Sequence, residues 1–255
     1  MGDAVGGDAV DAGLIACGAR AQVFVNDLAD PEVSPDDMHH LVNVLRLSDG
    51  EKVVLADGKG SWRLSTFDHS ARDVLRPAGE MHVVPAASNP VCVALAAVKG
   101  ERSAWAVAKL VEVNVDSIAL LVTDRGIVRW GAGRKDHALQ RLGRIAREAA
   151  AQARRAYVAS IVGPVTLAEL VESYPDGAVA LAHPGGDSSL ATLFATLSRA
   201  SAVAIGPEGG WSQRELAYGE NLPGGHLPRI SMGETIMRSE TAAVVAGAML
   251  KMVKS

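Results

Sequence analysis

Hydrophobic and polar positions along the chain form two different patterns. Up to about residue 86, short apolar runs alternate with turn residues, in the segments AQVFV, EKVVLADGKGSWRLSTF and EMHVVP. Asp57-Gly58 separates two strand-like runs within the second of these segments, which predicts a β-hairpin. One short helix is predicted around DDMHHLVNVLRL. We therefore expect this half of the chain to form a small β-barrel.

The second half alternates apolar strands with helical segments. The predicted strands are VCVALAAV, SIALLVT, AVALAH and SAVAIG, which are short and apolar throughout, as buried parallel strands are. Helices are predicted near residues 101–114, 136–156, 166–174, 188–199, 212–220 and 239–253. This alternation predicts an α/β sheet with helices on both faces. The segment PAASNP, residues 85–90, is the predicted linker between the two halves.

The composition is that of a soluble globular protein. Of the 255 residues, 48% are hydrophobic and 21% are charged. No apolar run approaches the ~18 residues that span a bilayer, so we expect no membrane segment. The chain starts with acidic residues and glycines, unlike a secretory signal, and we expect residues 1–19 to be a flexible tail. Because there are only two cysteines, Cys17 and Cys92, the expected location is a reducing cytoplasm.

Positive charge is concentrated in one segment, although the whole chain has a net charge of −4. Residues 125–155 include nine basic and two acidic residues, a distribution typical of proteins that bind a polyanion. In the predicted helix at 136–156, an apolar stripe lies opposite a basic face made of Arg141, Arg144, Arg147, Arg154 and Arg155. This face is either a solvated surface or a phosphate-binding surface. We favour phosphate contact, because guanidinium groups suit phosphate oxygens.

A glycine-rich loop in the stretch AIGPEGGWSQREL, residues 204–216, is the first candidate ligand site. Ser212 and Glu215 form the capping pattern S-x-x-E, so the loop runs from a buried strand into a helix. Ligands of open α/β sheets bind at the carboxyl ends of strands, where such loops lie. Glycines lack side chains, so backbone groups can approach a ligand. The alternative is a tight turn without a ligand.

The stretch LPRISMGETIMRSETAAVVAGAML, residues 227–250, is the second candidate site. It opens like a strand and ends in a helix that is apolar nearly all round, as helices in a core or a subunit interface are. The polar residues before this helix are Arg238, Ser239, Glu240 and Thr241. Helix capping explains Ser239 or Thr241 but not Arg238. Because alanines and Gly247 would admit a partner helix, we expect a homodimer.

Together these two stretches resemble the paired signature of the 16S ribosomal RNA uridine N3-methyltransferases, the RsmE family of the SPOUT class. GPEGGWSQREL and MGETIMRSETAA are similar to that family's G-P-E-G-G-[FW]-[ST]-x-x-E and L-G-x-x-[IV]-L-R-x-E-T-A. Met232 and Met237 replace the two leucines of the second pattern. The segment HHLVNVLRLSDGEKVVLADGKG also resembles the family's N-terminal half, so the resemblance extends from about Arg20 to the C-terminus.

The resemblance implies an α/β fold with a SPOUT-type parallel sheet tied in a C-terminal trefoil knot, helices on both sheet faces, and an N-terminal PUA-like small β-barrel. The expected domains are a flexible tail at 1–19, a PUA-like RNA-binding domain at 20–86 and a SPOUT methyltransferase domain at 87–255.

The resemblance also implies a site for S-adenosylmethionine, with the glycine loop and the loop before the last helix as its walls. The implied cofactor-binding residues are Leu181, Ala182, His183, Ile205, Gly206, Pro207, Glu208, Gly209, Gly210, Ile230, Met232, Gly233, Ile236, Met237 and Arg238. Arg238 is the candidate for holding a uracil oxygen or a phosphate, and Glu240 is either the base or an anchor for Arg238. The RNA-binding candidates are Arg46, Arg125, Arg134, Arg141, Arg144, Arg147 and Arg155. No metal is expected.

The implied reaction transfers a sulfonium methyl group to N3 of a uridine in 16S ribosomal RNA or in the assembled small subunit. Reaching N3 requires the uridine to leave its stack. Two other functions stay open: a SPOUT enzyme that methylates the ribose 2′-oxygen, and a non-catalytic RNA-binding protein. The first usually carries S-L-N-V-S where this chain has RSETAA, and the second has no need of two cofactor loops.

Overall fold

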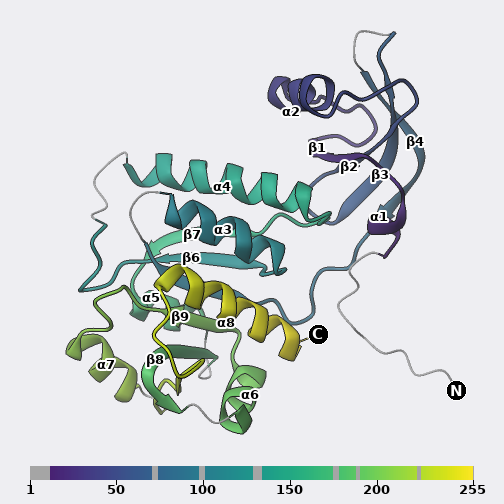
Figure 1. Ribbon diagram of the computed structural model, residues 1–255. Coiled ribbons are helices and arrows are strands. Elements are labelled where there is room, and N and C mark those ends of the chain that lie inside the picture. Colours follow the sequence, from purple (N-terminus) through teal and green to yellow (C-terminus); the bar gives the residue numbers. More distant parts are fainter. Residues whose placement is uncertain are drawn as a thin grey trace, which may run out of the picture. The chain divides into compact units, whose positions relative to one another are not determined.

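The structure, a computed structural model, describes residues 12–70, 74–97, 101–128, 134–174, 178–187, 190–222 and 225–254. The chain divides into two compact units (Figure 1), residues 1–88 with 147–158 and residues 89–146 with 159–255. The first boundary falls within the segment 85–90, where the linker was predicted. No sequence pattern assigned residues 147–158 to the first unit.

The first unit is built on a four-stranded sheet with the order β1-β2-β3-β4. Its strands are β1 (Ala21–Phe24), β2 (Lys52–Ala56), β3 (Ser61–Asp68) and β4 (Val74–Val83). β1 runs parallel to β2, and the other pairs are antiparallel. The hairpin predicted at Asp57-Gly58 is confirmed between β2 and β3. Gly58 has a φ of 76°, which favours glycine, and the Asp57 carboxylate accepts a backbone hydrogen bond from Lys59 at 2.7 Å.

The predicted short helix is confirmed as α2 (Pro35–His39), followed by the π-helical turn η1 (His40–Val44). Ser34 caps α2, since its hydroxyl accepts a hydrogen bond from the Asp37 backbone at 3.0 Å. The turn inserts Leu41, which is fully buried, into an apolar core with Val53, Leu55 and Phe67 of the sheet. This core stabilises the first unit.

The predicted tail at residues 1–19 is too long. Residues 12–16 form helix α1 (Ala12–Ala16), and Leu14 within it is only 2% exposed. The Cys17 thiol donates a hydrogen bond to the Leu14 carbonyl at 3.1 Å. Leu14 stands in the short apolar run Leu14-Ile15-Ala16-Cys17, which is too short for hydrophobic periodicity to reveal a helix. Residues 1–11 lie outside the described part of the chain.

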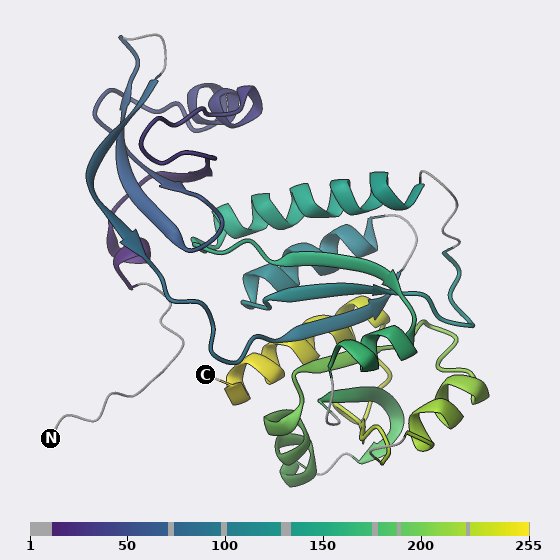
Figure 2. The same cartoon turned by 180° about the vertical axis from the view of Figure 1, so that it is seen from behind.

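The second unit is built on a six-stranded parallel sheet with the order β10-β8-β9-β5-β6-β7 (Figure 2). Its strands are β5 (Cys92–Ala96), β6 (Ser117–Leu121), β7 (Ser160–Val165), β8 (Val179–Asp187), β9 (Ala202–Ile205) and β10 (Arg229–Ile230). All the predicted strands are confirmed, and β10 is the short strand that opens the stretch 227–250. β7 was not predicted, because this edge strand is partly exposed and Gly163-Pro164 interrupts its apolar pattern.

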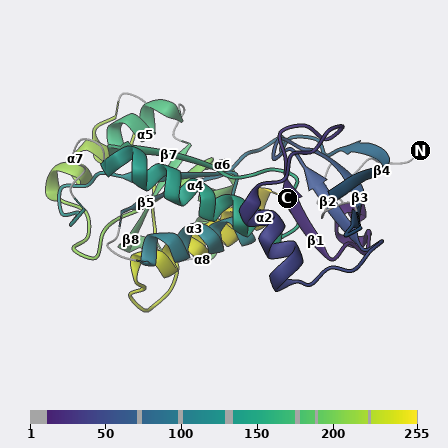
Figure 3. The ribbon, with the colours of Figure 1, turned by 90° about the horizontal axis from the view of Figure 1, so that it is seen from above.

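Helices cover both faces of this sheet, as predicted (Figure 3). The helices are α3 (Arg102–Glu112), α4 (Arg134–Gln152), α5 (Leu167–Ser173), α6 (Leu190–Arg199), α7 (Gln213–Glu220) and α8 (Ser239–Lys254). Residues of α5 and α7 pack on one face, and α3 and α8 pack on the other. α4 ends earlier than predicted, because Arg154 adopts a left-handed conformation with a φ of 54°.

Helix α8 corrects the expectation for Gly247. A Cβ at this position would lie 2.8 Å from Val115 and 2.9 Å from Leu110, so the glycine admits the helix to its own unit rather than to a partner. α8 packs on α3, β5 and β9, and its buried residues include Ala243, Ala246 and Leu250. Among the described residues, no helix is both long enough and apolar enough to cross a bilayer.

Candidate active site

A pocket of about 580 Å³ lies in the second unit, at the carboxyl ends of its strands. The loops that follow β6, β9 and β10, together with residues 182–184 of β8, form its walls. Its lining residues are Arg125, Ala182, His183, Pro184, Ile205, Gly206, Pro207, Glu208, Gly209, Gly210, Trp211, Ile230, Ser231, Met232, Gly233, Glu234, Thr235, Ile236, Met237, Arg238, Ser239 and Ala242. Four segments distant in sequence therefore meet around one cavity, as ligand sites of parallel sheets do.

The structure brings the implied cofactor residues together with one exception. Leu181 is 1% exposed and belongs to the apolar core, so it does not line the pocket. Sequence reasoning missed Trp211 and Ser239 as wall residues. Both lie within the two motif stretches, but only their contacts with other segments reveal their roles.

Trp211 and Ser239 hold the glycine loop in place. The Trp211 indole donates a hydrogen bond to the Ala182 carbonyl at 3.0 Å, and the Ser239 hydroxyl donates to the Gly206 carbonyl at 2.9 Å. A Cβ on Gly206 would lie 3.0 Å from the Trp211 ring, so a side chain there would displace the indole. The Gly210 backbone donates to the Pro207 carbonyl at 2.8 Å. The loop is thus a tight turn and also a wall of the pocket.

His183 is the titratable imidazole of the pocket. Burial, and then the nearby charge of Arg229, lower its pKa, so the ring is neutral near pH 7. Its Nδ1 accepts a hydrogen bond from the Gly185 backbone at 2.9 Å. The proton of the neutral ring therefore sits on Nε2, which makes His183 a hydrogen-bond donor toward the pocket.

Glu208 and Glu240 share one cation, Arg102, which the sequence analysis did not single out. The Arg102 Nη1 atom lies 2.7 Å from Glu208 Oε1 and 3.9 Å from Glu240 Oε2. Glu240 is 7% exposed and is not a wall residue of the pocket. Within the described residues its Oε2 accepts no hydrogen bond. Its charged neighbour is Arg102, not Arg238, which corrects the expectation that Glu240 anchors Arg238.

Arg238 lies at the end of the loop 231–238 and is exposed. It lines the pocket, and its backbone carbonyl accepts the first hydrogen bond of α8, from Ala242 at 2.8 Å. The helix therefore fixes the backbone of Arg238 at the wall of the pocket. Ile236, in the same loop, is 86% exposed.

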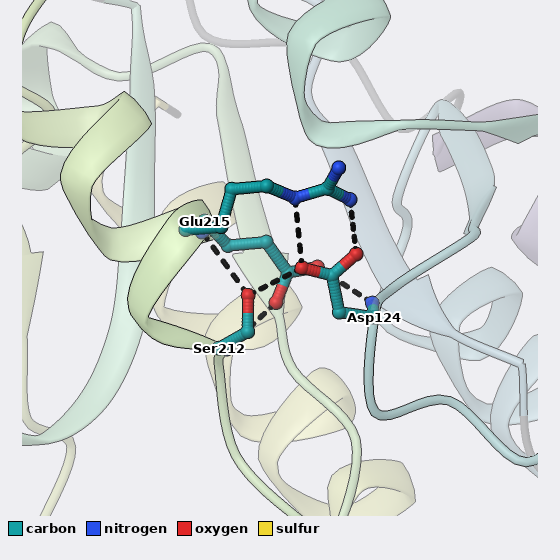
Figure 4. A network of polar contacts seen from close by, with 4 residues as sticks. Asp124, Ser212 and Glu215 are labelled. Carbon is teal, nitrogen blue, oxygen red and sulfur yellow. Dashed lines mark hydrogen bonds and ion pairs between the residues drawn. The ribbon is translucent and has the colours of Figure 1, made fainter.

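A polar network joins the loop after β6 to the first turn of α7 (Figure 4). The Asp124 carboxylate accepts hydrogen bonds from the Ser212 hydroxyl at 2.5 Å and from the Arg214 guanidinium. These contacts, the arginine first, lower the pKa of Asp124. The predicted capping box is confirmed, because Glu215 accepts from the Ser212 backbone at 2.7 Å. Glu215 also accepts from the Asp124 backbone at 3.0 Å.

The structure separates the predicted RNA-binding arginines into two groups. Arg147 is half-buried: it donates to the Phe24 carbonyl at 2.7 Å and lies 4.9 Å from the centre of the Phe24 ring. Arg155 is 9% exposed, and its carbonyl accepts from Gln22. These two arginines, like Arg154, hold residues 147–158 within the first unit, which corrects their prediction as a free phosphate-binding face.

The other group of arginines is more accessible. Arg144 and Arg46 are exposed, while Arg141 lies 2.7 Å from Glu101. Arg125 is exposed at the pocket. Arg134 starts α4, and its side chain lies outside the described part of the structure. In the described ranges no group of three or more metal-binding side chains occurs.

Comparison with known proteins gives matches over most of the chain. The model of the RNA methyltransferase domain matches residues 85–251, and that of the RNA methyltransferase PUA domain matches residues 33–67. The ribosomal RNA small subunit methyltransferase E of Mycobacterium bovis is 30% identical over 220 residues, covering 84% of this chain and 83% of that protein. Its counterpart in Synechocystis is 29% identical over 217 residues, covering 82% and 68%.

Solved structures show the same fold. A putative methyltransferase of Legionella pneumophila in complex with the cofactor SAM has a TM-score of 0.74 at 24% identity and covers 91% of this chain and 96% of that chain. A ribosomal RNA small subunit methyltransferase E of Neisseria gonorrhoeae, bound to S-adenosyl methionine, has a TM-score of 0.72 at 22% identity, covering 89% and 95%.

Proposed function

The chain belongs to the RNA methyltransferase family of ribosomal RNA small subunit methyltransferase E, and we propose that it methylates N3 of a uridine in 16S ribosomal RNA. The observation that carries this proposal is the pocket, whose walls combine the glycine loop with the loop 231–238. The named relatives act on ribosomal RNA of the small subunit. The proposed location is the cytoplasm, where bacterial ribosomes are assembled.

The residues of the pocket fit S-adenosylmethionine. Its volume of about 580 Å³ is in the range of small-molecule sites. Gly209 and Gly210 leave backbone groups open to a ligand, and Ile205, Ile230 and Met232 give an apolar lining. When bound there, the cofactor supplies an electrophilic methyl group on a sulfonium. Similar proteins of known structure are described with this cofactor.

Arg238 and His183 are the polar side chains proposed to act on the uracil. N3 carries a proton whose loss leaves negative charge on the ring. The Arg238 guanidinium is a cation with a planar set of donors and would stabilise that charge. The Nε2 proton of His183 is a second donor for a uracil oxygen. Glu240 is assigned to holding Arg102, because its carboxylate is buried outside the pocket.

We also propose the finer features of the fold that the family implies. The four-stranded sheet would close as a PUA-like barrel within residues 20–86, and residues 87–255 would form the SPOUT domain. A trefoil knot at the C-terminus is supported by the path of the chain: β10 pairs with β8, whereas α8, which follows it, packs on β9 and β5.

A homodimer is proposed through the helices α3, α6 and α8. α8 packs against both α3 and α6. Each of the three helices exposes a large apolar side chain: Trp105 is 46% exposed, Phe194 45% and Met252 75%. Exposed apolar side chains on neighbouring helices are typical of an interface.

Light scattering is expected to give twice the 26.5 kDa mass of one chain, and Trp105→Glu is expected to shift the protein toward that single mass. A glutamate would place a charge in the apolar interface. The matched control is Ile15→Glu, which changes a residue that is 59% exposed in the first unit and should leave the mass unchanged. An active wild-type species with the mass of one chain contradicts the homodimer.

RNA binding is expected to weaken in Arg144→Glu. Arg144 is exposed on α4, and each lost phosphate contact lowers the slope of log affinity against log salt by about 0.7 to 0.9. Filter binding of small subunits at several salt concentrations measures this slope. Arg199→Glu, the same charge change on α6, is the control. An unchanged slope in Arg144→Glu would remove this arginine from the RNA-binding surface.

Mass mapping of methylated nucleosides tests the function. Small-subunit RNA from cells without the gene should lack one N3-methyluridine, and the purified protein with S-adenosylmethionine should restore it. Loss of a 2′-O-methyl nucleoside would favour the ribose enzyme. An unchanged methylation map together with no cofactor binding would favour an RNA-binding protein without activity.

A further inference from the structure

Asp124 lies in the loop after β6 and contacts the start of α7, which follows the glycine loop. It is not itself a lining residue of the pocket. We propose that Asp124 is a positioning residue that acts through its neighbour Arg125, holding that guanidinium across the glycine loop for the RNA substrate. This inference rests on the proposed function, and it adds a residue to the site that no motif indicated.

Asp124 is fixed to α7 by both its side chain and its backbone. Its carboxylate accepts from Ser212 at 2.5 Å and from Arg214 Nε at 3.1 Å, while its backbone N–H donates to Glu215 at 3.0 Å. Glu215 is 8% exposed, so this carboxylate is a buried acceptor that needs its partners. The loop after β6 therefore cannot shift without breaking contacts at the start of α7.

Asp124 and Arg125 lie within a tight turn. The Gly126 backbone donates to the Thr123 carbonyl at 3.1 Å, and a Cβ on Gly126 would lie 2.8 Å from the Thr123 hydroxyl. Because the turn is tight, the contacts that fix Asp124 also fix the backbone position of Arg125. The hydrogen bonds from Arg214 keep the pKa of Asp124 below its usual range, so the carboxylate stays ionised at physiological pH.

Arg125 reaches from this turn to the glycine loop. Its Nη1 atom donates to the Gly209 carbonyl at 2.9 Å, and its side chain lines the pocket. Among the described residues this is the one hydrogen bond that its side chain makes, and a guanidinium has five N–H donors. The donors that remain suit phosphate oxygens of the RNA nucleotide at the pocket. One side chain thus touches the glycine loop and faces the RNA.

The test is a double-mutant cycle on Asp124→Ala and Arg125→Ala. Asp124→Ala is expected to lower kcat/KM for unmethylated small subunits by about 10- to 100-fold, the effect of a misplaced positioning group. The affinity for S-adenosylmethionine, measured by calorimetry, should change less than about twofold. In the Arg125→Ala background, Asp124→Ala should cause no further loss, because its effect passes through Arg125.

Two further variants define the result. Arg214→Ala removes the guanidinium that pairs with the Asp124 carboxylate. Because the Arg214 side chain is 83% exposed, this variant should fold, and it should show the same loss of kcat/KM as Asp124→Ala. Glu112→Gln removes a surface ion pair with Lys109 on α3 and should have no effect. Additive losses in the cycle, or an equal loss of cofactor affinity, would overturn the proposal. If the wild type methylates nothing, the proposed function fails, and the same cycle on small-subunit affinity still decides the role of Asp124.

Discussion

Replacing Gly209 by valine is expected to abolish binding of S-adenosylmethionine while the protein stays folded. Gly209 lines the pocket, and unlike Gly210 it does not have a positive φ, so the backbone accepts another residue. A Cβ there would lie 3.4 Å from the Cβ of Arg125, so the two methyl groups of valine would crowd the Arg125 side chain and displace this wall of the pocket. Calorimetry should show an affinity reduced by at least about 100-fold, on the scale of 1.4 kcal/mol for each factor of ten.

Gly143→Val is the matched control for this prediction. Gly143 lies in α4, and a Cβ at this position meets no atom within 4 Å. This variant should bind the cofactor like the wild type, and circular dichroism should show that both variants are folded. Wild-type affinity in Gly209→Val would mean that the glycine loop is only a turn.

Arg238→Ala is expected to lower the rate of methyl transfer by about 10² to 10³, the cost of removing one donor that stabilises charge in a transition state. The side chain lines the pocket and is exposed, so its loss should not unfold the protein. The affinity for S-adenosylmethionine should stay within a few-fold, since backbone groups and apolar residues form most of the site. Single-turnover kinetics on unmethylated small subunits measures the rate.

Arg238→Lys separates charge from geometry. Lysine keeps the positive charge but loses the planar fork of donors. An intermediate rate is expected if charge and hydrogen-bond geometry both contribute. Full activity in Arg238→Ala would exclude Arg238 from the chemistry, and loss of cofactor affinity equal to the loss of rate would make it a cofactor-binding residue instead.

The two motif stretches allowed most of the pocket wall to be predicted. The capping pattern at Ser212 and Glu215 correctly placed the start of α7, and the apolar runs correctly placed β5, β6, β8 and β9. Contacts between segments far apart in the chain leave no comparable pattern in the sequence. Arg102 and Asp124 lie 106 and 88 residues from their partners Glu208 and Ser212, so no local spacing connects them.

The arginines of α4 show the same limit. Helical periodicity placed Arg144 and Arg147 on one polar face, and a charged face alone indicates solvent or a polyanion. In the structure the Arg147 guanidinium donates a hydrogen bond to the Phe24 carbonyl, whereas Arg144 is exposed. Periodicity describes one helix and cannot show which neighbour covers part of its surface.

The sequence by itself determined most of the order of helices and strands, apart from α1 and β7, as well as two of the loops around the pocket and the family, because all of these depend on residues close together in the chain. Only the tertiary structure decided which of the implied residues line the pocket, which arginines are buried, and that Gly247 faces its own unit. Local structure follows from capping, turn residues and hydrophobic periodicity, whereas burial and charge pairing depend on segments that meet only when the sheet is assembled.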